Sequence, residues 1–115
     1  MLSLSSRDKI YLCASSIDFR KQVNGLISLT QSILEENPYS QNYFVFVNRG
    51  KTAIKILHFD GQGYCMLFKK LSKGKFRWPS GEEKKLTLSP TELQILFMSG
   101  NFKKAQIQED WIKAA

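Results

Sequence analysis

The chain has 115 residues, of which 43% are hydrophobic and 12% aromatic, and a formal net charge of +7. This length predicts one domain over residues 1–115, and the composition excludes an intrinsically disordered chain. No apolar run approaches the roughly 18 residues of a membrane span and no signal peptide opens the chain, so we expect a cytoplasmic protein without a membrane partner.

The first predicted elements are a strand at residues 10–14 and a helix that ends near residue 36. The unbroken apolar run of the strand suits a position inside a sheet. Asp18 is the best N-cap candidate for the helix, and Asn37-Pro38 follows its end. Gly25 indicates close packing of this helix against a strand, although a tolerated surface glycine is nearly as good an explanation.

The central stretch predicts an antiparallel meander. Residues 43–47, 53–59 and 64–68 are apolar and rich in β-branched or aromatic side chains, with polar glycine-bearing turns between them. We expect a fourth strand near residues 75–78. Aromatic area is most useful when buried, so Phe76 and Trp78 are expected in the core rather than stacked on unpaired bases.

A last strand is predicted at residues 84–88, before a second helix that begins at Ser89 and stops at Gly100. Ser89 and Glu92 have the spacing of a capping box, with proline at the first helical position. The predicted fold class is therefore α+β: a mostly antiparallel sheet, made of a central meander of three to four strands plus flanking strands, with two main helices packed on one face. The core would span residues 10–100, and residues 101–115 would be a helical or mobile tail.

Chemistry-bearing side chains are few. Asp18 and Asp60 have structural explanations as a cap and a turn residue, and His58 has no histidine or cysteine partner nearby in the sequence. Cys13 and Cys65 lie in apolar runs without C-x-x-C spacing, which is typical of buried thiols in a reducing compartment. We predict no catalytic residues, no metal and no cofactor.

The positive charge is concentrated between residues 49 and 85, where ten basic residues face three acidic ones. Such an excess attracts polyanions, nucleic acid first. The alternative is that these lysines protect edge strands and turns from aggregation. The predicted nucleic-acid-binding residues are Arg20, Lys21, Arg49, Lys51, Lys55, Lys69, Lys70, Lys73, Lys75 and Arg77.

The order of short motifs resembles one known family. D-x-R-K-x-x-x-G-L matches residues 18–26, F-V-F matches 44–46, K-I-L matches 55–57, D-G-x-G matches 60–63, and K-x-L with a later G-x-F-x-W-P matches 69–79. Together they resemble the TnpB-type accessory proteins of the sixty-six class of bacterial insertion sequences, a second-open-reading-frame-like family distinct from the RNA-guided nucleases of the same name.

Two departures from the family pattern soften the basic hairpin: Phe59 stands where tryptophan is more usual, and Thr52-Ala53 replaces a more charged turn. The resemblance implies an accessory role in transposition beside a separate transposase, and it supplies no catalytic residues. We therefore expect a non-catalytic accessory factor that binds DNA through a basic sheet surface, with the cognate transposase as a second partner. The alternatives are a protein adaptor that binds the transposase without DNA and, less favoured, a metal-dependent nuclease.

Overall fold

The computed structural model describes residues 4–79 and 81–99. These residues form five strands and two helices. The predicted helix stop at Gly100 and the predicted tail at residues 101–115 lie outside the described residues. In chain order the elements are β1 (Ile10–Cys13), α1 (Val23–Ser32), β2 (Tyr43–Val47), β3 (Ala53–Phe59), β4 (Tyr64–Lys70), β5 (Lys85–Leu88) and α2 (Pro90–Ser99).

The five strands form one sheet in the order β4-β3-β2-β1-β5. β2, β3 and β4 are the predicted antiparallel meander. β1 lies inside the sheet, as expected, parallel to β2 and antiparallel to β5, so that Ile10 is opposite both Tyr43 and Leu88. A parallel pair needs a long crossover, and α1 supplies it between β1 and β2.

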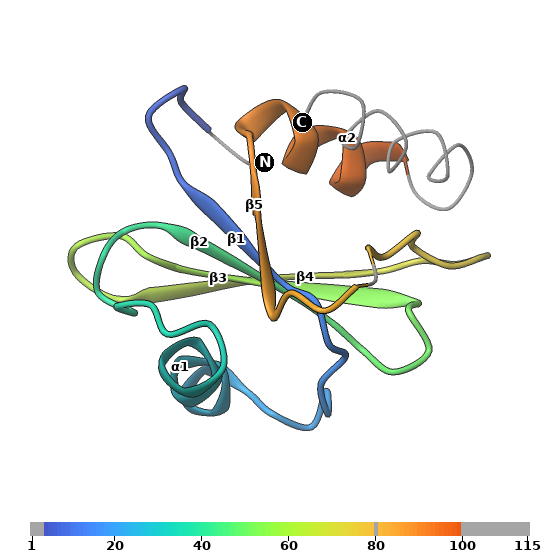
Figure 1. Cartoon of the computed structure of the whole chain (residues 1–115), viewed down its shortest axis with the longest axis horizontal. Helices are drawn as coiled ribbons and strands as arrows, with labels where there is room; N and C mark the ends of the chain where they lie inside the picture. Colours follow the sequence, from blue (N-terminus) through green and yellow to red (C-terminus); the bar gives the residue numbers. More distant parts are fainter. Residues whose placement is uncertain (1–3, 80, 100–115) are drawn as a thin grey trace.

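The two helices lie on opposite faces of the sheet, with α1 on one side and α2 on the other (Figure 1). The prediction of both helices on one face was wrong. Its physical reason is visible in β2, where Phe44 and Phe46 point to the α1 side and Val45 and Val47 to the α2 side, all fully buried. An unbroken apolar strand is typical of a sheet that is covered on both faces.

The α2-side core includes two aromatic residues from the connection between β4 and β5. Phe76 and Trp78 are 2% and 5% exposed, which confirms their expected place in the core. The indole Nε1 of Trp78 donates to the carbonyl of Cys13 at 2.9 Å. The strand predicted at 75–78 was wrong, because this segment has irregular backbone and joins no ladder.

The second helix starts as predicted. The Glu92 amide donates to Ser89 Oγ at 3.1 Å, and the Ser89 amide donates to Glu92 Oε1 at 2.8 Å, so the capping box is confirmed. The first helix does not start where it was predicted. α1 begins only at Val23, and its N-cap, Gln22, makes no side-chain hydrogen bond. The prediction of Asp18 as the cap was therefore wrong.

The cysteines differ from the expectation in one case. Cys13 is buried, but Cys65 is exposed, because β4 is an outer strand with little to cover it. Both thiols are free. Within residues 4–79 and 81–99, no helix has the length and apolar character needed to cross a membrane.

Candidate nucleic-acid interface

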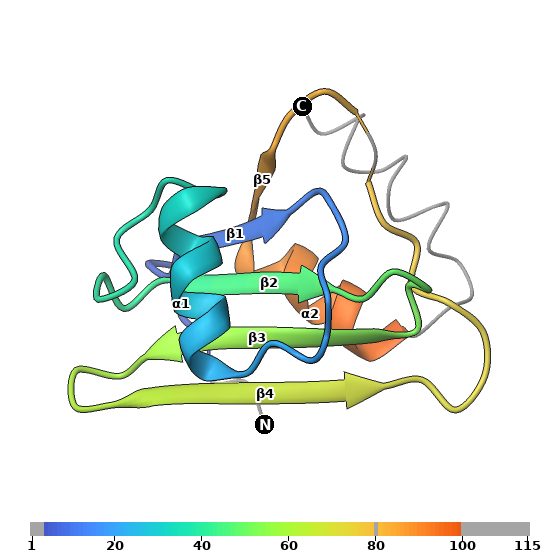
Figure 2. The same cartoon turned by 90° about the horizontal axis from the view of Figure 1, so that it is seen from below.

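Eight of the ten predicted site residues lie at one end of the strands rather than on a face of the sheet. Here β1, β2 and β4 end and β3 begins, at the right-hand side of Figure 2. Residues 14–22, 48–52 and 70–79 meet there and carry one acidic residue, Asp18. Their basic residues, which we call the basic end, are Arg20, Lys21, Arg49, Lys51, Lys70, Lys73, Lys75 and Arg77. β5 also begins at this end, where the Ala14 amide donates to Lys84 O at 3.0 Å, so the exposed Glu82 and Glu83 that precede Lys84 lie beside these segments.

Backbone hydrogen bonds hold these three segments together. The Ile17 amide donates to Val47 O at 2.9 Å, the Phe76 amide to Lys51 O at 2.7 Å, and the Leu71 amide to Thr52 O at 2.8 Å. The turn between β2 and β3 is thus tied to the segments on both sides of it. Since the three segments that carry the basic residues are fixed to one another, the basic end is a defined surface rather than a set of independent loops.

Asn48 organises the turn that carries Arg49 and Lys51. Its Oδ1 accepts from the amides of Thr52 at 2.8 Å and Ala53 at 3.1 Å. An asparagine side chain that bonds nearby backbone in this way mimics a turn hydrogen bond. Lys51 has a φ of 59°, so the turn holds a non-glycine residue in the left-handed region.

Asp18 and Arg20 form an ion pair at the edge of a shallow depression of about 330 Å³, lined by Ile17, Asp18, Arg20 and Arg49. Arg20 donates through Nε and Nη2 to the carboxylate, at distances of 2.7–3.1 Å. The side-chain bond to Arg20 holds the pKa of Asp18 at about 2, below the ordinary 3.8, and the carboxylate in turn raises the pKa of Arg20. The carboxylate predicted as a helix cap therefore orients an arginine instead.

Lys55 is one of two predicted site residues that are not in the basic end. It is 2% exposed, and its Nζ donates to the carbonyls of Phe19 at 3.0 Å and Lys21 at 2.8 Å. The ammonium also lies 4.9 Å from the ring centre of Phe19 and 5.7 Å from that of Phe68. Burial lowers the pKa of Lys55. This lysine fastens the segment that carries Arg20 and is not available to a ligand.

Lys69 is the other. It donates to the carbonyl of Phe97 in the last turn of α2 and lies 4.6 Å from the centre of its ring. Lys85, which was not a predicted site residue, donates likewise to Leu34 O just beyond α1 and to the Glu36 carboxylate. Lysines near helix C-termini satisfy free carbonyls and interact favourably with the helix dipole. Both therefore bind helices to the sheet.

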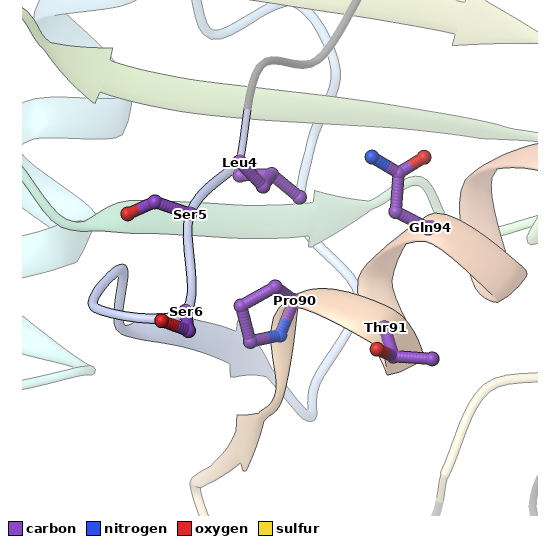
Figure 3. A pocket seen from close by; sticks show the side chains of 6 residues that line it. All are labelled: Leu4, Ser5, Ser6, Pro90, Thr91 and Gln94. Carbon is purple, nitrogen blue, oxygen red and sulfur yellow. The ribbon is translucent and has the colours of Figure 1, made fainter.

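The rest of the described structure offers no competing chemical centre. In residues 4–79 and 81–99, no three histidine, cysteine, aspartate or glutamate side chains are grouped so as to hold a metal ion. A second hollow of about 360 Å³ lies between the N-terminal segment and the start of α2 (Figure 3). Its walls are uncharged, with Leu4 and Pro90 among serine, threonine and glutamine side chains, so it lacks the charge that a polyanion requires.

Comparison with known proteins identifies relatives of the chain and the family to which it belongs. It is 32% identical over 111 residues to a protein named uncharacterized protein y4hO of Sinorhizobium fredii, covering 96% of this chain and 95% of that one. It is also 32% identical over 96 residues to uncharacterized protein y4jC of the same organism, covering 84% and 82%. No solved structure matches the chain. The model of the family described as IS66 Orf2 like protein matches residues 8–107, and the chain belongs to that family.

Proposed function

We propose that this protein is a non-catalytic accessory factor of transposition that contacts the phosphate backbone of DNA through its basic end. Membership of the IS66 Orf2 like family supports a role accessory to transposition. The observation that carries the DNA contact is the basic end itself: eight basic residues on three mutually bonded segments, whose one acidic residue is paired to Arg20. The neighbouring residues 81–84 add Glu82, Glu83 and Lys84, so nine basic residues still stand against three acidic ones.

The distribution of charge favours a polyanion over solubility as the explanation. Lysines that only protect a sheet from aggregation belong along the edge strands. Here seven of the eight side chains are exposed and Lys51 is half-buried, and seven of the eight residues occupy the loops at one end, while Lys70 is the last residue of the outer strand β4. Cations gathered in this way neutralise several phosphates at once, and the released counterions drive binding.

A mobility shift with a random duplex over a salt series tests the DNA contact. The logarithm of affinity should fall by about 0.9 for each phosphate neutralised per tenfold rise in salt. Absence of binding, or binding that salt does not weaken, would refute the proposal.

Two matched charge reversals locate the contact. The double variant Lys70→Glu/Lys75→Glu changes the basic end, and Arg7→Glu/Lys9→Glu makes the same change in charge near the start of β1, at the opposite end of the strands. All four side chains are exposed. We expect the first variant to bind at least tenfold more weakly and the second to lose no more than about threefold, the share due to net charge. Equal losses would show that overall charge, and not the basic end, attracts DNA.

The second candidate function is an adaptor that binds the transposase without touching DNA. The observation that favours it is Phe68, an aromatic side chain that is 49% exposed on the outer strand β4. Large exposed apolar groups are enriched at protein interfaces. Co-purification with the cognate transposase that resists nuclease, survives Lys70→Glu/Lys75→Glu and is lost with Phe68→Ser would support the adaptor.

A further inference from the structure

We propose that Arg20 and Arg49 form a clamp that holds one phosphate group of the DNA backbone over the depression between them. This inference rests on the proposed DNA contact and names the atoms that would make its most specific part. The two guanidinium groups come from different segments, one before α1 and one in the turn between β2 and β3, and they line the same depression together with Ile17.

The ion pair leaves Arg20 ready for a second acceptor. A guanidinium has five N–H donors, and Asp18 takes those of Nε and one of Nη2. The remaining three N–H groups are on the far edge of the same plane. An arginine fixed side-on by a carboxylate keeps its orientation and loses less side-chain entropy when an anion binds. Asp18 is thus a positioning residue for Arg20.

Arg49 contributes charge that has no counterpart. Among residues 4–79 and 81–99, no carboxylate pairs with its guanidinium, and the one carboxylate of the depression is engaged by Arg20. The two arginines and Asp18 therefore leave one net positive charge. Ile17, 8% exposed, also lines the depression and contributes apolar surface to it. Electrostatic attraction to an anion is stronger beside such a low-dielectric wall than in open water.

Further contacts fix the segment that presents Arg20. Lys55 donates to the carbonyls of Phe19 and Lys21, on either side of Arg20 in sequence. A Cβ at Gly25 would lie 2.9 Å from Cβ of Lys21, so the absence of a side chain there lets Lys21 rest on the first turn of α1. The sequence left two explanations for this glycine, close packing against a strand and a tolerated surface position, whereas the atoms nearest to an added Cβ belong to Lys21. These contacts account for the spacing of the aspartate, the arginine, the lysine and the glycine in one motif.

Phosphate fits this pair better than a protein carboxylate. Both anions accept paired N–H bonds from arginine. A phosphodiester offers two non-bridging oxygens that point in different directions, so each can face one guanidinium. The three segments of the basic end carry further basic residues beyond these two arginines, and a chain of phosphates can contact several of them at once while a single aspartate or glutamate cannot.

The first experiment separates the effect of the paired N–H donors of arginine from the effect of its positive charge. Arg20→Lys, Arg49→Lys and the neutral Arg20→Gln and Arg49→Gln are compared in binding to a random duplex at fixed salt, with Arg7→Lys as the control. The clamp predicts that lysine recovers little of the loss, so that each Arg→Lys variant binds about fivefold to tenfold more weakly while Arg7→Lys is unchanged within twofold. Losses below twofold for both Arg→Lys variants would overturn the clamp.

The second experiment uses Asp18→Asn, which removes the one acidic residue of these segments. Simple electrostatics predicts tighter DNA binding, because net charge rises by one. The clamp predicts weaker binding by about threefold or more, because Arg20 loses its orientation. It also predicts that Asp18→Asn adds nothing in an Arg20→Gln background. Tighter binding by Asp18→Asn would overturn the clamp.

The outcomes separate this inference from the proposed function. If the unaltered protein binds no DNA, both fail. If it binds DNA and the clamp variants behave as simple charge changes, the clamp fails and the DNA contact stands. If Arg20→Lys and Arg49→Lys keep DNA binding but lose nuclease-resistant co-purification with the transposase, the ligand is a protein carboxylate and the phosphate assignment is wrong. A urea midpoint for each variant identifies losses due to unfolding, and Arg49→Lys breaks no ion pair within the described residues.

Discussion

Lys55→Ala should destabilise the protein, although loss of a lysine from a strand usually costs little. The matched control is Lys70→Ala, because Lys70 lies on the same face of the adjacent strand and is exposed. Lys55 differs from it by burial and by its two bonds to the carbonyls of Phe19 and Lys21.

The magnitude follows from what the substitution removes. Three buried methylenes contribute about 2.4 kcal/mol at about 0.8 kcal/mol each. Two hydrogen bonds from a charged donor contribute about 3–6 kcal/mol at about 1.5–3 kcal/mol each. The cost of taking the ammonium out of water, several kcal/mol for a buried ion, is recovered and offsets part of this. We expect a net loss of about 2–4 kcal/mol for Lys55→Ala, against about 0.5 kcal/mol or less for Lys70→Ala.

Urea unfolding followed by far-UV circular dichroism measures the difference. With a denaturant slope of about 1–3 kcal/mol/M, the midpoint of Lys55→Ala should fall on the order of 1–2 M with an unchanged slope. Lys55→Met keeps the apolar stem and removes the ammonium, so it should lose less than Lys55→Ala. Equal midpoints for Lys55→Ala and Lys70→Ala would refute the structural role of Lys55.

Three further outcomes are expected. Trp78→Phe should cost about 1–3 kcal/mol in urea unfolding, because the buried carbonyl of Cys13 loses its donor; a change below 0.5 kcal/mol would contradict that bond. In a carboxyl NMR titration Asp18 should titrate near 2, and Arg20→Ala should return its pKa toward 3.8. Because the pKa of Asp18 is lower in the folded than in the unfolded protein, the ion pair stabilises the fold above about pH 3.8, and that contribution is lost as pH falls through about 2. A thiol reagent should modify Cys65 in the native protein and reach Cys13 only on unfolding, because burial both shields Cys13 and raises the pKa of its thiol; equal rates would be inconsistent with the fold.

Local signals predicted the elements well. The Asp60-Gly61 turn forms as expected: Asp60 Oδ1 accepts from the amides of Gln62 and Gly63, and Gly61 has a φ of 98°. The capping box of Ser89 and Glu92 formed in both of its bonds. These features depend on side chains within four residues of one another, and such interactions can be read from sequence alone.

Several of the errors depend on distant parts of the chain. Phe76 and Trp78 alternate with exposed Lys75 and Arg77, which is the period of a strand. Periodicity reports which side chains are buried, however, and a strand also needs a partner for its backbone. Cys65 was expected to be buried, but whether β4 is inner or outer depends on where β1 inserts.

The same limit applies to the basic end. The sequence indicated which cations were in excess, but their gathering at one end of the strands follows from the sheet order. Lys55 carried a local signal of its burial, because alternation puts it on one face with Ala53 and Leu57. Asp18 gave no such signal. A carboxylate before a helix can either cap the helix or form an ion pair with an arginine two residues later, and the sequence does not distinguish these two roles.

The interior position of β1 has a consequence for synthesis of the protein. Its two neighbours are β2, some thirty residues later, and β5, which ends at Leu88, so the first strand made is paired on both sides only when nearly the whole described chain exists. The meander of β2, β3 and β4 has short connections and can form earlier, because nearby pairings close smaller loops. In stalled nascent chains, protease protection should therefore appear in the meander before β1, and the reverse order would contradict this folding sequence.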